Sequence, residues 1–155
     1  MPMNSIPLLR ILLQRAETER NSALGAMRQA ETLVQQALAQ ARQLQDYRSE
    51  YDQRWVAHFQ ESGTTELLHC HRTFGQRLDH AILVQDNNTS QLGNRVQRAR
   101  GILLTREQRV AALRKLIALR QAEEQKLADR RDQRNTDEAA QRAHSAAKLR
   151  DALPH

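Results

Sequence analysis

The chain has 155 residues and a net charge of +6, and 39% of its residues are hydrophobic while only 3% are aromatic. Many of the hydrophobic residues are alanine, which buries little apolar area, so a compact globular core is excluded. The single cysteine, Cys70, excludes an internal disulfide. With neither a run of about 18 apolar residues nor a secretory signal pattern, we expect a cytoplasmic protein.

Alanine, leucine, glutamine, arginine and glutamate dominate the sequence, and all of them favour helices. The first predicted helix spans about 7–61, with Asn4 or Ser5 as N-cap and Pro7 in the first turn, where proline is tolerated. A seam with the coiled-coil period of 3.5 residues runs along it. Its positions are Leu9, Leu13, Ala16, Arg20, Ala23, Met27, Ala30, Val34, Ala37, Ala41, Leu44, Arg48, Tyr51, Trp55 and His58.

A turn is predicted at 62–64, where Gly63 suits a left-handed helix C-cap and Thr64 or Thr65 can cap the next helix. The second helix is then expected over about 65–150 and carries a seam of its own. Its positions are Leu78, Ile82, Gln85, Thr89, Leu92, Val96, Ala99, Leu103, Arg106, Val110, Leu113 and Ile117.

Two seams joined by a short turn predict an all-α fold, a long antiparallel two-helix coiled-coil hairpin in a single domain. Folding back about Gly63 pairs residues whose numbers sum to roughly 127. The second helix is the longer one, so its tail beyond about 121 has no partner, and we expect that tail to be frayed or ordered only when bound.

Charge is unevenly distributed along the chain. Residues 95–120 contain 8 basic residues and one acidic residue, whereas residues 1–94 contain 9 basic and 10 acidic residues. A basic stretch of this kind suits an acidic protein partner or nucleic acid, or is simply a solvated face. It contains no aromatic residue for base stacking, which disfavours nucleic acid.

No pattern in the sequence points to catalysis, a cofactor or a metal. The run His69-Cys70-His71 is the only cluster of metal-ligating residue types, and consecutive helical residues point about 100° apart. Isolated glycines make no phosphate-binding loop, and two helices enclose no pocket for a nucleophile. We therefore predict a protein that is not an enzyme.

Aromatic residues converge near the predicted turn. Tyr47, Tyr51 and Trp55 lie on successive helical turns, and the pairing rule brings them close to Phe74. Tyr51 and Leu78 occupy seam positions and should be core. Tyr47 and Phe74 lie off the seam and should be exposed, which is typical of a protein-binding hot spot.

The order Leu44, Tyr47, Tyr51, a turn containing glycine, then Phe74, Leu78, Ala81 and Ile82 resembles the flagellar type III export protein family FliJ. The resemblance covers nearly the whole chain. It implies a non-enzymatic cytoplasmic stalk, peripheral at the inner membrane through the export apparatus. Its implied partners are the hexameric export ATPase, into whose ring it inserts, the cytoplasmic domain of the export gate protein FlhA, and export chaperones.

The positions that match the family's gate-binding surface are Gln40, Leu44, Tyr47, Tyr51, Phe74, Leu78 and Ala81. For the ATPase ring, we expect a basic patch made of Arg106, Arg109, Arg114, Lys115 and Arg120. The alternatives are the equivalent stalk of a virulence type III secretion system, a basic coiled-coil nucleic-acid-binding protein, and a plain structural or dimerising coiled coil.

Overall fold

The computed structural model describes residues 5–153, and two helices account for nearly all of them. Helix α1 spans Ser5–Ser62 and helix α2 spans Thr65–Ala152. The predicted bounds of about 7–61 and 65–150 are therefore accurate to two residues, and no strand occurs in the described part of the chain. The all-α prediction, with the second helix longer than the first, is confirmed.

The turn between the helices consists of Gly63 and Thr64. Oγ1 of Thr64 accepts a hydrogen bond from the backbone N–H of Leu67 at 3.2 Å, which is the N-cap interaction expected for α2. The left-handed conformation predicted for Gly63 is wrong, because its φ lies outside the left-handed region. Glycine is needed there for space instead: an added Cβ would lie 2.9 Å from ring carbons of Phe59 and 3.1 Å from its carbonyl oxygen.

The chain divides into two compact units, and each contains parts of both helices. One unit, here called the hairpin unit, comprises residues 17–107 with the turn. The other, the terminal unit, comprises the start of α1 up to Ala16 and the part of α2 that begins at Gln108. Single-domain organisation was the expectation from the sequence, and the two units are described separately below.

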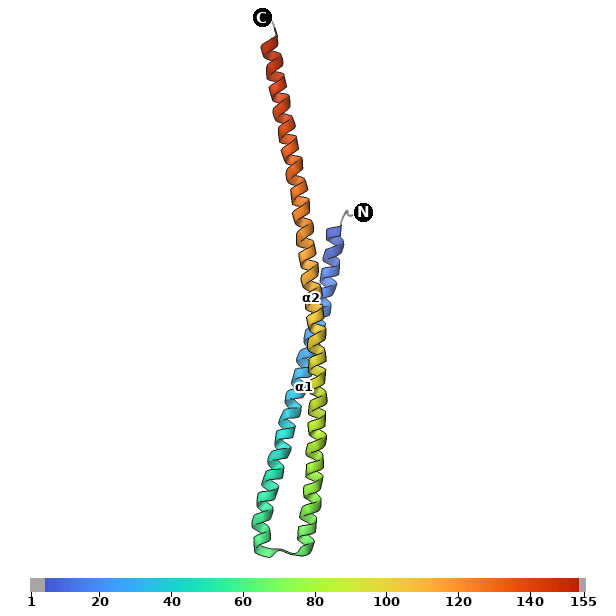
Figure 1. The fold of residues 1–155 in the computed structure, drawn as a ribbon, viewed down its shortest axis with the longest axis vertical. Coiled ribbons are helices and arrows are strands. Elements are labelled where there is room, and N and C mark those ends of the chain that lie inside the picture. Colours follow the sequence, from blue (N-terminus) through green and yellow to red (C-terminus); the bar gives the residue numbers. More distant parts are fainter. Residues whose placement is uncertain (1–4, 154–155) are drawn as a thin grey trace. The chain divides into compact units, whose positions relative to one another are not determined.

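In the hairpin unit, α1 and α2 run antiparallel from the turn (Figure 1). The core lies along the predicted seam, with Ala37, Leu78, Val96 and Leu103 all less than 9% exposed. Every other predicted seam residue of this unit is partly buried except His58, which is exposed. The seam therefore ends at Trp55, one position earlier than expected.

Polar contacts between the helices confirm the predicted pairing in this unit. Nη2 of Arg100 lies 3.1 Å from Oε1 of Glu31, and Nε of Arg48 lies 2.9 Å from Oδ1 of Asp79. Nε2 of Gln85 donates to the backbone carbonyl oxygen of Ala37 at 3.1 Å. These residue numbers sum to between 122 and 131, which brackets the value of 127 expected from the sequence.

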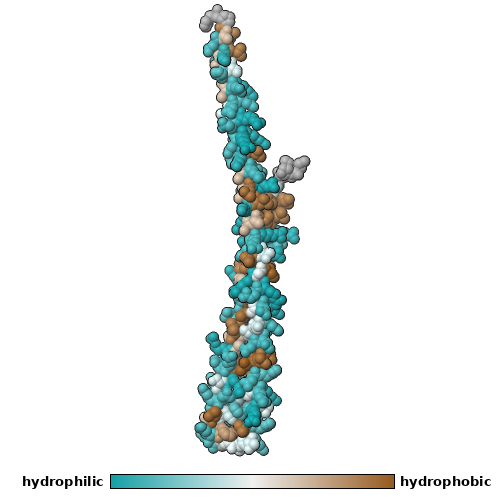
Figure 2. All heavy atoms as spheres, viewed as in Figure 1, coloured by the Kyte–Doolittle hydropathy of each residue, from teal (hydrophilic) through white to brown (hydrophobic). Residues whose placement is uncertain are grey.

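In the terminal unit, Ile6 and Leu9 of α1 are buried, and so are Val110 and Ile117 of α2. Other apolar residues of this unit are open to solvent, and exposed basic residues such as Arg10 and Lys115 lie near them in sequence. Figure 2 shows hydrophobic residues gathered on the surface near the start of α1. The large exposed apolar residues of this region are Leu8, Ile11, Leu116 and Leu119.

From Gln121 onward every described side chain of α2 is exposed, although the segment is helical to Ala152. The surface of this tail is mostly hydrophilic (Figure 2). The absence of buried side chains agrees with a tail that has no partner within the described chain. Its order in the absence of a binding partner stays a prediction. None of the described helices has a stretch long and apolar enough to cross a membrane.

Candidate protein-binding surface

One flank of the hairpin unit carries the aromatic face, which we define as the seven residues that the sequence assigned to gate binding. They are Gln40, Leu44, Tyr47, Tyr51, Phe74, Leu78 and Ala81. Three of them, Leu44, Tyr51 and Leu78, belong to the seam. Of the other four, Gln40, Tyr47 and Ala81 each lie three residues after a seam position, and Phe74 lies four residues before one. In an antiparallel pair, these equivalent positions of both helices meet on the same flank. The four therefore lie on one flank, next to the three seam residues.

Exposure within the aromatic face agrees with the seam prediction. Leu78 is only 8% exposed and Tyr51 is partly buried, so both belong to the core. Tyr47 is 48% exposed and Phe74 is 37% exposed. The prediction that these last two rings are accessible is confirmed, and they are large enough to fill a pocket on a partner.

The rings near the turn form a connected stack across the two helices. The ring of Tyr51 lies 4.8 Å from that of Phe74 and 5.0 Å from that of His71. His71 in turn lies parallel to Trp55, with ring centroids 4.5 Å apart and an interplanar angle of 7°. Burial is the main cause that raises the pKa of Tyr51 above its usual value. Contacts between α1 and α2 thus set where Tyr51 and Phe74 lie.

Sequence reasoning did not find the role of His71. It treated His71 only as a member of a possible metal cluster, whereas the ring stacks on Trp55. Nδ1 of His71 and Nε1 of Trp55 are buried without a hydrogen-bond partner among the described residues, so stacking holds this pair rather than hydrogen bonding. The signal that was available is the pairing rule, since 55 and 71 sum to 126. No group of three metal-ligating side chains occurs between residues 5 and 153.

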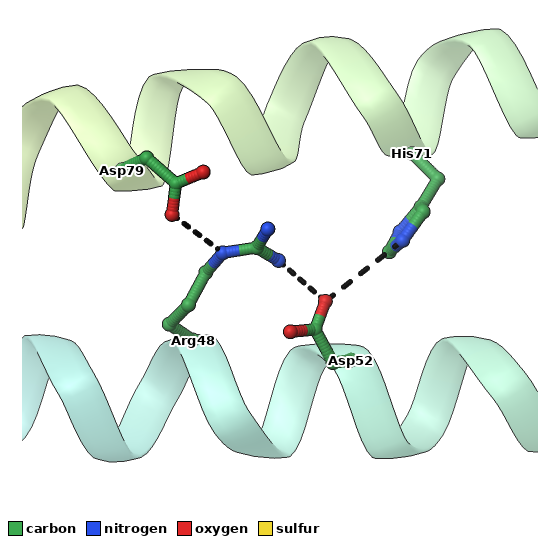
Figure 3. A network of polar contacts seen from close by, with 4 residues as sticks. All are labelled: Arg48, Asp52, His71 and Asp79. Carbon is green, nitrogen blue, oxygen red and sulfur yellow. Dashed lines mark hydrogen bonds and ion pairs between the residues drawn. The ribbon is translucent and has the colours of Figure 1, made fainter.

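An ion-pair network, here called the Arg48 network, connects the two helices beside this stack (Figure 3). Nε of Arg48 donates a hydrogen bond to Oδ1 of Asp79 on α2 at 2.9 Å, and Nη1 donates to Oδ1 of Asp52 on α1. Nε2 of His71 lies 3.9 Å from the same Asp52 oxygen. The hydrogen bond to Asp79 is the largest contribution that raises the pKa of Arg48.

The Arg48 network occupies the flank opposite the aromatic face. Asp52 and Asp79 each lie one residue after a seam position, and such positions meet on the other side of an antiparallel pair. A shallow groove of about 360 Å³ opens there, lined by Arg48, Leu68, His71, Arg72, Gly75, Gln76 and Asp79. The hairpin unit is therefore two-sided, with exposed rings on one flank and paired charges on the other.

The five residues of the predicted basic patch all lie on α2, but their surroundings differ. Arg106 belongs to the hairpin unit, where Nη1 lies 3.4 Å from Oε2 of Glu19, so part of its charge is already neutralised. Arg109, Arg114 and Lys115 are exposed in the terminal unit, and Arg120 there is partly buried. The terminal unit also contains Arg10 and Arg15, and neither 5–16 nor 108–120 contains an acidic residue.

Comparison with known families decides which coiled coil this is. The family model described as "Flagellar FliJ protein" matches residues 6–149. The chain belongs to the flagellar FliJ protein family. The match covers both helices almost from end to end, so it does not depend on one short motif. Searches of curated proteins and of solved structures found no match.

Membership of the FliJ family makes the chain a component of the flagellar type III export apparatus. The family is a structural part of that apparatus, and the two long helices of this chain agree with a structural role.

Proposed function

We propose that the chain is a non-enzymatic stalk that links the export ATPase ring to the export gate and promotes the export of flagellar proteins. In this arrangement, the aromatic face of the hairpin unit binds the cytoplasmic domain of FlhA. The terminal unit inserts into the ring of the hexameric ATPase and promotes its activity. Export chaperones are further partners of the stalk, which is held at the cytoplasmic face of the inner membrane by these contacts.

The observation that carries the gate assignment is the exposure of Tyr47 and Phe74, at 48% and 37%, beside the seam residues of the aromatic face. A partly exposed ring that lies beside seam residues has limited conformational freedom, so it loses little side-chain entropy when a partner binds. Aromatic side chains in such positions are typical of interface hot spots, where few residues supply most of the binding free energy.

Support for the ring assignment comes from the terminal unit. Its paired part presents the exposed residues Leu8 and Ile11 and has basic residues without acidic ones in 5–16 and 108–120. A surface that combines apolar and positively charged side chains suits a partner surface that combines apolar side chains with carboxylates. The family match favours the flagellar machine over a virulence secretion system as the client.

Alanine substitution tests the gate assignment. Tyr47→Ala and Phe74→Ala should each weaken binding to the FlhA cytoplasmic domain by about tenfold or more, because a hot-spot ring contributes at least ~1.4 kcal/mol. Helicity by circular dichroism should stay unchanged, and cells should lose motility. Phe59→Ala is the matched control, since Phe59 is 38% exposed on α1 but lies outside the aromatic face. Equal binding by all three variants would refute the assignment.

Charge reversal tests the ring assignment. Replacing Arg109, Arg114 and Lys115 together by glutamate should lower stimulation of the ATPase, because a carboxylate partner would then be repelled. The matched control replaces Arg28, Arg42 and Arg54 by glutamate, which are three exposed arginines of α1 in the hairpin unit. Stimulation that falls equally in both triple variants, or in neither, would contradict a ring contact at the terminal unit.

A further inference from the structure

The seam of the hairpin unit contains a charged residue at a position where an apolar one is usual. Arg48 occupies a seam position on α1, and its side chain is 24% exposed, so most of it lies between the helices. A charge in a coiled-coil seam lowers stability and in return fixes the register of the helices. Arg48 therefore needs a structural explanation beyond hydrophobic packing.

Opposite Arg48, α2 provides space for the guanidinium group. Gly75 is buried, and a Cβ atom added there would lie 3.0 Å from Nη2 and 3.3 Å from Cζ of Arg48. Contacts that short are tighter than nine in ten real Cβ contacts, so a larger residue at position 75 would force the guanidinium to move by a few tenths of an ångström. Gly93 and Gly101 of α2 differ from Gly75, since a Cβ at either would meet nothing within 4 Å.

The guanidinium is also tied to α2 by charge. Nε of Arg48 donates to Asp79 at 2.9 Å (Figure 3). Asp79 lies four residues, about one helical turn, after Gly75. Shape and charge thus hold Arg48 at the same place on α2. A shift of α2 along α1 by one residue would move the glycine away from the guanidinium and break the ion pair.

Both members of this contact adjoin the aromatic face. Phe74 directly precedes Gly75, and Tyr51 follows Arg48 by three residues, or nearly one helical turn. The rings of Tyr51 and Phe74 lie 4.8 Å apart. The distance and register between α1 and α2 at Arg48 therefore decide how these two rings meet.

We propose that Arg48 and Gly75 form a register clamp, which holds Tyr51 and Phe74 in the arrangement that the export gate recognises. The clamp rests on the proposed function only for the identity of the partner. Arg48 and Gly75 are positioning residues, because they meet between the helices and do not belong to the aromatic face. They affect gate binding only by fixing where Tyr51 and Phe74 lie.

The first test measures thermal stability and needs no partner. Gly101→Ala should raise the Tm by about 4 °C, because alanine favours helix over glycine and the site is open. Gly75→Ala should lower the Tm instead, because the new methyl group displaces the guanidinium. In the Arg48→Met background the same alanine should raise the Tm, as at Gly101. A rise for Gly75→Ala in the unaltered chain, or a fall in both backgrounds, would overturn the clamp.

The second test measures binding to the cytoplasmic domain of the gate. Arg48→Met leaves an apolar residue in the seam, so helicity and Tm should be retained, yet binding should weaken about tenfold as the register is no longer fixed. Arg42→Met is the matched control, because Arg42 is an exposed arginine of α1 that belongs neither to the seam nor to the aromatic face. Binding by Arg48→Met equal to that of Arg42→Met would overturn the positioning role.

The two proposals fail in different ways. If Tyr47→Ala leaves gate binding unchanged, the gate assignment is wrong, and the stability test still decides whether the clamp exists. If Tyr47→Ala weakens binding while Arg48→Met does not, the gate assignment stands and the positioning role is wrong.

Discussion

Two stretches of α2 are helical for different reasons. Residues 65–107 pack on α1 in the hairpin unit and bury Val96 and Leu103 at 6% and 8% exposure. Residues 121–152 of the terminal unit bury nothing, and even Leu127 is 52% exposed. The first stretch is supported by tertiary packing, whereas the second has only the helix propensity of its residues and local pairs to support it. One continuous helix thus contains a segment that needs a partner and a segment that lacks one.

The largest expected effect comes from replacing a buried leucine by aspartate, compared with the same replacement of an exposed leucine in the tail. Leu103→Asp should destabilise the hairpin unit by about 3 kcal/mol or more, because it buries an unpaired carboxylate. Leu127→Asp should change stability by no more than about 0.5 kcal/mol, because that side chain is already in water. Thermal unfolding followed by circular dichroism measures both. Similar losses in the two variants would mean that the tail packs on something.

A smaller effect should distinguish propensity from packing in the tail. Ala143→Gly should cost about 1 kcal/mol of local helix stability, because 139–147 is rich in alanine and has no tertiary support. Amide hydrogen exchange should therefore speed up around position 143 and stay unchanged for the amides around Val96. Uniform acceleration along the whole of α2 would instead indicate that the two stretches unfold together.

The smallest effect concerns a single local ion pair of the tail. Nη2 of Arg142 lies 3.8 Å from Oε2 of Glu138, one helical turn away. Glu138→Gln should lower local helix stability by about 0.3 kcal/mol, and only at low salt, because both side chains are exposed. Helicity measured at low and high ionic strength checks this. A loss that persists in high salt would contradict a screened surface pair.

Much of the fold and part of the candidate surface could be predicted because their signals are local. Helix ends follow from the Thr64 cap and the absence of internal proline, and the period of 3.5 residues identifies the seam. The same period predicted that Tyr47 and Phe74 are exposed while Leu78 is core. The role of these residues in gate binding came from family resemblance and stays a proposal, because no local pattern specifies a partner.

Other features depended on residues that are distant in sequence. The predicted seam includes Arg48 among mostly apolar residues, but the partner of that arginine, Asp79, is 31 residues away. No local pattern indicates that Gly75 lies against the guanidinium of Arg48. The left-handed conformation predicted for Gly63 was wrong, although the contacts that limit the space there come from Phe59, only four residues away.

The amino-acid sequence by itself determined that this chain forms two long helices, where they end and which side of each is apolar, because those properties depend on residues within one or two helical turns. Only the tertiary structure decided how Arg48, Gly75 and His71 are used. Their contacts cross from one helix to the other. Such contacts can be predicted only when the register of the two helices and the side-chain conformations are known.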